Sequence, residues 1–218
     1  MEQILVRVSR TQEERASATR ARLMEATLAL LLSKGYAAAT MVDISAHAGL
    51  SRGALSHHYE SKDELVVEAF THFLETTTSE IRTYASQVGA GSLSNDDFVD
   101  RLWSIFSGPF FMTTLELITA SRHNDLLKEM LVERTREFHK SLDEIWCQCF
   151  SRTHSANLEV ETALNATLCL LRGMGVQTVL RDDPAYYRRL LEFWKSALTA
   201  QTKTFEPARG GARRARTR

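Results

Sequence analysis

The sequence predicts an all-α protein. Alternating runs of Val, Ile or Thr between hairpin turns are nearly absent, so strands have little support. Only three prolines and ten glycines occur in 218 residues, which leaves room for long helices. Helix-start signals recur instead, because Thr11, Ser61 and Ser94 are each followed three residues later by an acid. In such a pair the first side chain accepts from a free amide, and the acid favours the positive helix end.

The composition is typical of a globular protein, with 44% hydrophobic and 25% charged residues. The formal net charge is zero, so overall charge does not draw the chain onto phosphates. The N-terminus lacks a secretory apolar core, and no apolar run approaches the ~20 residues of a membrane span. Three cysteines without framework spacing indicate free thiols. We expect a cytoplasmic protein that does not contact membranes.

The first half of the chain predicts four helices. The first spans residues 12–34, with a buried stripe that includes Leu23 and Leu30, and Gly35 ends it in the left-handed conformation. Two short helices follow, joined by residues 48–50. A long helix begins after Ser61 and runs to about residue 86, and residues 86–94 form a loop.

The second half predicts further helices and a tail. A helix runs to about residue 108, Pro109 breaks the chain, and an apolar segment reaches residue 121. Helices follow over 124–152, 158–181 and 184–203, with Pro184 near a first helical position. The tail, residues 206–218, has five arginines and no apolar stripe, so we expect it to be disordered. The tail is either solvated without a partner or attracts DNA non-specifically through its positive charge.

Residues 40–59 have the pattern of a helix-turn-helix. Thr40 caps the first helix, Ser51 caps the second, and Gly49 supplies the backbone freedom that the turn needs. Ile44 and Leu55 point into the angle between the helices. The small residues Ser45 and Ala48 allow a close crossing, and Leu50 fills the base of the turn.

The outer face of the second short helix suits DNA. Because Leu55 points inward, Arg52, Gly53, Ser56 and His57 are left for solvent or a partner. Arg52 lies in the first turn, where a recognition helix reaches base edges, and an arginine can bond two acceptors of a guanine. The small residues Gly53 and Ala54 keep the helix narrow enough to enter a major groove. The amides at the helix starts capped by Thr40 and Ser51 can hold phosphates, and Lys62 is a further phosphate contact.

Residues 23–66, "LMEATLALLLSKGYAAATMVDISAHAGLSRGALSHHYESKDELV", resemble the DNA-binding domain of the TetR family of bacterial transcriptional regulators. Three residues depart from the usual pattern: Ser45 replaces Ala, Ser56 replaces a DNA-contacting Tyr, and Tyr59 replaces Phe. The resemblance implies a three-helix DNA-binding domain over 1–65 and a helical effector-binding and dimerisation domain over 66–205. It implies no catalysis, cofactor or metal. The expected DNA contacts are Thr40, Ser51, Arg52, Gly53, Ala54, Ser56, His57, His58, Tyr59 and Lys62.

Several local alternatives stay open. Residues 49–59 could be a plain surface helix, and His58 could pack partly into the domain. A metal role for His57 and His58 is disfavoured because adjacent helical positions point ~100° apart. Several arginines lie near the start of the chain. This segment is either an N-terminal arm that contacts DNA or a flexible leader. The arginines are Arg7, Arg10, Arg15, Arg20 and Arg22.

The helix over 184–203 carries two apolar stripes, a face too wide for a monomer's surface helix. With the preceding helix it would form a four-helix bundle about a two-fold axis, the dimer interface that the resemblance also implies. The alternative is that all of these residues are core. A dimer would read a near-palindromic operator, with half-sites one DNA turn apart. The interface is predicted from Leu170, Gly173, Met174, Leu180, Tyr187, Leu191, Trp194 and Leu198.

Residues 101–124 are the most apolar and aromatic part of the chain. They are either core or the wall of an effector pocket, as the resemblance implies, because Met and aromatic residues at a helix break suit an apolar ligand. The candidate lining residues are Trp103, Phe106, Phe110, Phe111, Met112, Leu115, Glu116, Arg122, His123 and Trp146.

We therefore expect a homodimeric repressor that a small, largely apolar effector releases from double-stranded DNA. Two other classes of protein are alternatives. A small helical enzyme has little support, because no paired carboxylates or nucleophile–base set stand out at a helix break. A helical module that binds protein through its helix-turn-helix is the other alternative.

Overall fold

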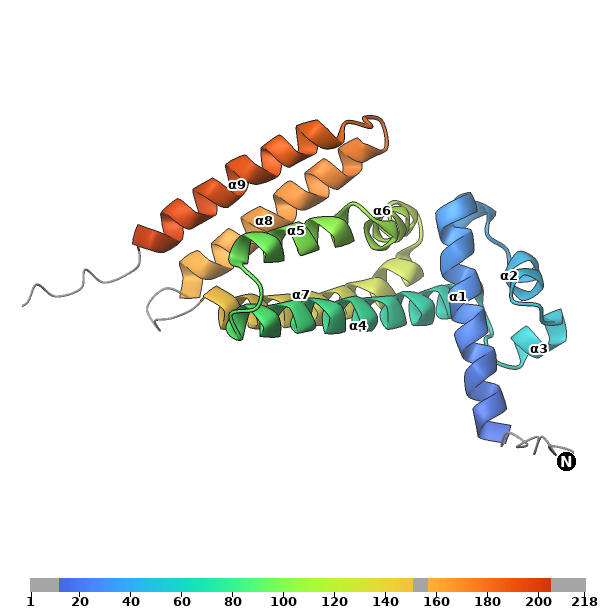
Figure 1. Cartoon of the computed structure of the whole chain (residues 1–218). Coiled ribbons are helices and arrows are strands. Elements are labelled where there is room, and N and C mark those ends of the chain that lie inside the picture. The colour runs from blue at the N-terminus through green and yellow to red at the C-terminus, as the bar shows by residue number, and fades with distance from the viewer. Residues whose placement is uncertain (1–11, 151–156, 205–218) are drawn as a thin grey trace, which may run out of the picture. The chain divides into compact units, whose positions relative to one another are not determined.

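The structure, a computed structural model, describes residues 12–150 and 157–204, and all its regular elements there are helices (Figure 1). The predicted all-α class is confirmed. The helices are α1 (Gln12–Ala38), α2 (Met41–His47), α3 (Arg52–Ser56), α4 (Lys62–Gly89), α5 (Asn95–Phe106), α6 (Pro109–Ser121), α7 (Asp125–Phe150), α8 (Asn157–Thr178) and α9 (Pro184–Thr204).

Helix starts agree with the sequence better than helix ends. Ser94 and Asp97 form the capping box of α5, and the Glu64 amide donates to the Ser61 hydroxyl at 3.1 Å. Two expectations need correction. The segment 86–94 is not all loop, because α4 continues to Gly89, and Pro109 begins α6 rather than only breaking the chain. Proline is favoured at a first helical position, where its missing N–H would have no partner anyway.

Gly35 interrupts α1 near its end, as the sequence predicts. Its φ is +77°, which L-residues with a side chain rarely adopt, although the helical segment resumes after it and reaches Ala38. The predicted stripe before the kink is confirmed, because Leu23, Thr27, Leu30 and Leu31 are all buried.

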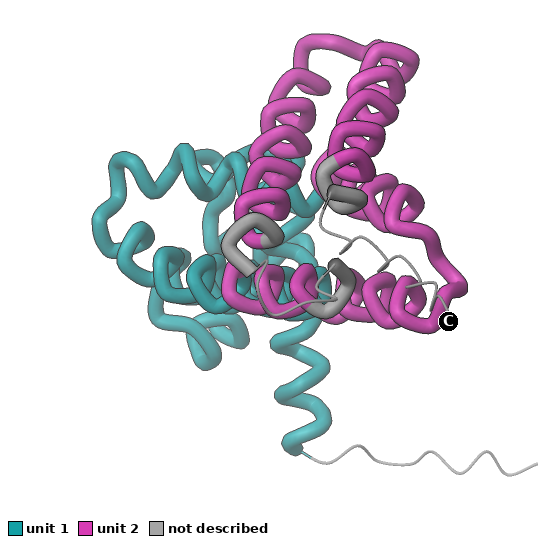
Figure 2. The backbone as a smooth tube through the Cα atoms, turned by 90° about the vertical axis from the view of Figure 1, so that its left-hand side faces the viewer, with its two compact units in different colours: residues 1–78, 109–138 teal, residues 79–108, 139–218 magenta. Residues whose placement is uncertain are grey.

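The chain forms two compact units (Figure 2): residues 1–78 with 109–138, and residues 79–108 with 139–218. This division differs from the predicted boundary at residues 65–66, which falls inside the continuous helix α4. In the first unit α6 packs against α1, so this central segment belongs with the N-terminal helices. In the second unit α5, α8 and α9 pack on one another.

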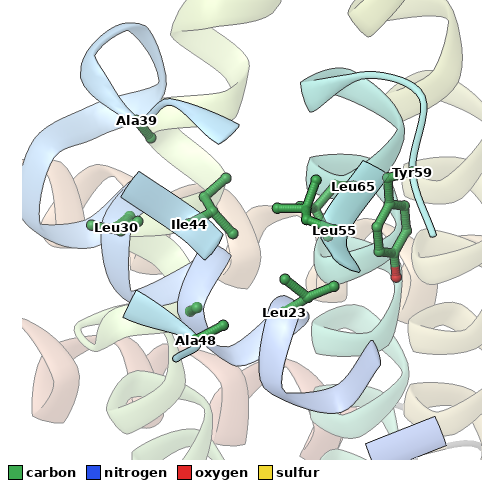
Figure 3. Close-up of a cluster of buried hydrophobic side chains, with 9 residues drawn as sticks. Leu23, Leu30, Ala39, Ile44, Ala48, Leu55, Tyr59 and Leu65 are labelled. Atoms are coloured by element: carbon green, nitrogen blue, oxygen red, sulfur yellow. The ribbon is translucent and has the colours of Figure 1, made fainter. Parts of the chain in front are cut away.

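The first unit contains a core built by the N-terminal helices and the start of α4. Ile44, Leu55 and Leu65 lie against Leu23 of α1, and Met41 and Leu50 pack at the edge (Figure 3). Ile44 and Leu55 therefore fill the angle between α2 and α3, as predicted. Burying each of these side chains contributes about 1.5–3 kcal/mol, which fixes the crossing of two helices too short to be stable alone.

The described helices include none that is long and apolar enough to cross a membrane. Within the same residues, no group of three or more His, Cys, Asp or Glu side chains is placed to hold a metal ion. Cys147 and Cys169 are free thiols. Arg7, Arg10, the tail over 206–218 and the side chain of Cys149 lie outside the described part.

Candidate nucleic-acid interface

The turn between α2 and α3 is held by backbone and side-chain hydrogen bonds. Gly49 has φ +63°, and the Leu50 amide donates to the Ser45 carbonyl at 2.9 Å. Arg22 of α1 donates to the carbonyls of Ala48 and Gly49. A cation near a helix C-terminus satisfies free carbonyls and complements the helix dipole. Arg22 thus fixes the turn, a role that its place among the N-terminal arginines did not reveal.

Both short helices are capped as the sequence predicts. The Asp43 amide donates to the Thr40 hydroxyl at 3.1 Å, and the Asp43 carboxylate accepts from the Thr40 amide and hydroxyl. The Thr40 hydroxyl, followed by the Lys34 ammonium at 3.3 Å, lowers the pKa of Asp43. At α3 the Ala54 amide donates to the Ser51 hydroxyl at 3.1 Å. Thr40 and Ser51 therefore stabilise the helices by capping.

The outer face of α3 is exposed at each position expected to face a partner. Arg52, Gly53, Ser56 and His57 are exposed, whereas Leu55 is 1% exposed. Arg52 has no hydrogen bond or ion pair within the described residues, so its guanidinium is available. The Ser56 hydroxyl donates to the Gly53 carbonyl at 3.0 Å. This hydroxyl therefore bonds within its own helix, at the position where the family pattern has a DNA-contacting Tyr.

Tyr59 requires a correction. It is 2% exposed and belongs to the core, so it cannot contact DNA in this fold. Burial, followed by the nearby Glu68 carboxylate, raises the pKa of its hydroxyl. His58 is half-buried, with its ring centroid 6.4 Å from that of Tyr59. The alternative in which His58 packs partly into the domain is therefore the observed arrangement.

Lys62 is also engaged within the chain. Its ammonium donates to the Tyr36 carbonyl at 2.9 Å and lies 4.0 Å from the centroid of the Tyr36 ring. An ammonium has three donors, so a phosphate contact would have to share this group.

Tyr36 lies at the centre of a polar junction in the first unit. Its hydroxyl donates to Asp63 of α4, and the Asn124 amide donates to Asp63 at 2.9 Å and to the Tyr36 hydroxyl at 3.2 Å. The Tyr36 backbone N–H donates to Glu116 of α6 at 2.6 Å. Burial and the hydrogen bond to Asp63 raise the pKa of Tyr36 to about 12. No local sequence pattern predicts this junction, because its members come from α1, α4, α6 and the residue before α7.

The structure brings together only part of the predicted effector set. Met112, Leu115 and Glu116 line a pocket of about 320 Å³ with Leu31, Leu32, Gly35 and Thr119. Phe110 and Phe111 are buried core residues, and the ring centroid of Phe110 lies 5.4 Å from Phe73 and 5.6 Å from Phe138. Arg122 and His123 are exposed just beyond α6.

The remaining three members belong to the second unit. Trp103 packs against Tyr187, with centroids 5.5 Å apart, and Trp146 packs against Phe98 at 6.1 Å. Phe106 is 1% exposed and lies beneath the Arg172 guanidinium. We correct the expectation for these three residues, because Phe106 and Trp146 are buried in the core of that unit and the half-buried Trp103 packs against Tyr187.

The two stripes of α9 are assigned the other way round from the prediction. Tyr187, Leu191 and Leu198 are buried within the chain, and the Trp194 indole N–H donates to the Thr167 hydroxyl at 3.0 Å. Met174 is also buried and Leu170 is half-buried. The other stripe, which we call the exposed stripe, consists of the half-buried Tyr186, Leu190 and Ala197 and of Phe193, which is 73% exposed. Of the predicted interface residues, Leu180 (94%) and Gly173 are exposed.

Comparison with known proteins assigns the family. Residues 23–69 match the model for bacterial regulatory proteins of the tetR family. The regulator CymR of Pseudomonas putida is 29% identical over 182 residues, covering 83% of this chain and 89% of CymR. This chain belongs to the TetR family. The match contains α2, α3 and the exposed face of α3, so this TetR-family protein is a DNA-binding transcriptional regulator.

Two further relatives agree with this assignment. The regulator BetI of Burkholderia cenocepacia is 25% identical over 181 residues, covering 79% of this chain and 88% of BetI. The crystal structure of a TetR-family regulator from Mesorhizobium loti aligns with a TM-score of 0.70 at 17% identity, covering 86% of this chain and 98% of that one. These proteins are regulators rather than enzymes, and the structural likeness extends the family fold over the C-terminal helices.

Proposed function

We propose that this TetR-family regulator is a homodimeric repressor that reads a near-palindromic operator with α3 and is released by a small ligand. The observation that carries the DNA contact is the exposed face of α3, with Arg52 available on it and Leu55 buried behind it. A bidentate arginine–guanine contact discriminates against a wrong base by about 1–3 kcal/mol. Arg52 is the base-reading residue in this proposal, and His57 and the helix starts hold the phosphate backbone.

Exposed apolar side chains support self-association through α8 and α9. They lie on α8, on the turn after it and on α9: Val176, Val179, Leu180 and Phe193. Gly173 is exposed, and a Cβ added there would meet nothing within 4 Å. Isolated apolar residues are common on surfaces, but a Phe and a Leu exposed to this extent favour a partner. A second copy would place two α3 helices about 34–36 Å apart on DNA.

The polar junction at Tyr36 supports a ligand response. The junction connects α1 to α4, α6 and α7 through hydrogen bonds. Helix α1 packs against α2 and shares its hydrophobic core with the helix-turn-helix. A ligand that binds one arrangement of these helices more tightly shifts the population toward it. The shift lowers DNA affinity only as far as the ligand's affinities for the two states differ.

The test is selection of bound duplexes from a random pool, followed by titration of the selected operator. Arg52→Ala is expected to weaken operator binding about 10- to 100-fold and to leave binding to an unrelated duplex nearly unchanged. Arg136→Ala removes the same charge from an exposed position on α7 and is the control. Equal operator affinity for Arg52→Ala and the parent would overturn the assigned role, and failure to select any duplex would overturn DNA reading as a whole.

A further inference from the structure

The geometry points to a ligand site in the pocket between α1 and α6, and to a small amphipathic cation as its ligand. The regulatory consequence of such binding rests on the proposed function above, whereas the binding itself does not. The pocket belongs entirely to the first compact unit. Its volume of about 320 Å³ is at the small end of ligand pockets, which measure about 300–1,000 Å³.

Both apolar and polar groups line the pocket, and four of the lining side chains are apolar. Leu31 and Leu32 come from α1, and Met112 and Leu115 come from α6. Leu32 is 44% exposed, so a ligand would cover apolar surface that water now reaches. Methionine adapts to ligands of different shape and contacts aromatic rings favourably. These walls suit a short aryl or alkyl body.

Glu116 supplies the charge that selects a cation. It is half-buried, and one carboxylate oxygen accepts from the Tyr36 N–H at 2.6 Å. The other oxygen accepts no hydrogen bond and forms no ion pair within the described residues. The neighbouring lysines have other partners, since Lys34 pairs with Asp43 and Lys62 donates to the Tyr36 carbonyl. An ammonium in the pocket would therefore gain a charge-assisted hydrogen bond.

Gly35 allows the carboxylate to approach the backbone. A Cβ at Gly35 would lie 2.8 Å from the nearer oxygen of Glu116, so a side chain there would displace it. The kink at Gly35, with φ +77°, also turns the Tyr36 N–H out of the helix and makes it available to Glu116. The kink and the acid thus form one wall of the pocket.

The same carboxylate connects the pocket to the DNA-binding helices. Tyr36, which donates to Glu116, also bonds to Asp63 and to Lys62 at the start of α4. A cation bound to Glu116 competes with the Tyr36 N–H for the negative charge of the carboxylate. The cation would also lie next to the junction of α1 and α4. We expect ligand binding to change operator affinity through this junction, in the direction of release.

The primary experiment measures binding without DNA. Full-length protein with labelled methionine methyl groups is titrated with phenethylammonium and with its neutral analogue 2-phenylethanol. The methyl resonance of Met112 should shift, whereas that of Met174, buried in the second unit, should not. The cation should bind about tenfold more tightly than the alcohol, as a charge-assisted hydrogen bond predicts.

Two variants test the recognition. Glu116→Gln keeps an acceptor for the Tyr36 N–H but removes the charge, so it should abolish the preference for the cation and leave the alcohol's affinity within about twofold. Glu129→Gln, at an exposed position on α7, should change neither affinity. Thr119→Phe fills the pocket from its edge and should weaken both ligands.

The outcomes separate the site from the function. An unshifted Met112 resonance, or equal affinities of the cation and the alcohol for the parent protein, overturns the site while operator binding remains intact. A normal Met112 titration in a protein that selects no DNA overturns the proposed function instead. Tight cation binding that leaves operator affinity unchanged overturns the coupling through Tyr36.

Discussion

The backbone N–H of Tyr36 donates to the Glu116 carboxylate at 2.6 Å, and 80 positions of sequence separate the two residues. The bond connects the kinked end of α1 to α6 in the first compact unit. It occurs where Gly35 breaks the regular hydrogen bonding of the helix, so Glu116 satisfies an amide that the helix leaves unpaired.

Removing the Glu116 acceptor should destabilise the first unit. Glu116→Ala leaves the half-buried Tyr36 N–H without its partner, which costs about 1–3 kcal/mol. Glu116→Gln keeps an acceptor and should stay within about 0.5 kcal/mol of the parent. Urea unfolding followed by circular dichroism measures both. Equal losses for the two variants would show that charge, and not the hydrogen bond, stabilises this contact.

Tyr36→Phe should also reduce stability, because it removes the hydroxyl shared by Asp63 and Asn124. The expected loss is about 1–2 kcal/mol, since both partners stay behind in a half-buried site. Tyr84→Phe is the matched control, as the Tyr84 hydroxyl bonds to the exposed Glu80 in the preceding turn of the same helix.

The contribution of the Tyr36 hydroxyl to folding stability should also depend on pH. Its pKa is raised from 10.0 to about 12, so the protonated form is favoured in the folded state. Its contribution to stability is therefore fully present below pH 10 and is lost as the pH rises toward 12. The stability difference between the parent and Tyr36→Phe should narrow over that range. A difference that stays constant would contradict the assigned shift.

The helix-turn-helix could be predicted from the sequence almost residue by residue, whereas the junction behind it could not. Caps, the turn glycine and the inward Leu55 are local signals that depend on offsets of a few residues. The Tyr36 contacts join elements that are distant in sequence. Tyr59 lies within the DNA-contacting motif, so position alone predicts a contact, whereas its large aromatic ring is buried in the small core.

The α9 stripes show a second limit of sequence reasoning. Both stripes are apolar, and spacing alone cannot tell which one faces the rest of the chain. The structure resolves this through polar anchors next to the buried stripe: the Lys195 ammonium donates to Asp100 at 2.7 Å and to Glu192 at 3.0 Å. Asp100 lies on α5, which therefore covers that side of α9.

Two glycines of the helix-turn-helix should respond to alanine in opposite directions. Gly49→Ala meets a positive φ and Arg22 Nη2 at 2.9 Å, so it should destabilise the fold by about 1–2 kcal/mol. Gly53→Ala meets only the Ser51 hydroxyl at 3.9 Å and should stabilise α3 by up to about 1 kcal/mol. Operator affinity should fall for Gly53→Ala if α3 needs a slim outer face. A stabilised variant with unchanged affinity would remove that role from Gly53.

Substitutions on the exposed stripe of α9 should separate association from folding. Phe193→Asp places a charge on an outward side chain and, in a dimer that uses this face, should yield monomers at micromolar concentration by sedimentation. Its thermal unfolding should still be cooperative, because Phe193 is 73% exposed within the chain.

Two further variants are the controls for this prediction. Leu191→Asp buries a charge in the core instead and should unfold the second unit. Ile118→Asp, on an exposed position of α6, controls for added charge. A Phe193→Asp protein that sediments like the parent would move the interface away from this stripe, and operator binding by a monomer would remove the argument for a palindrome.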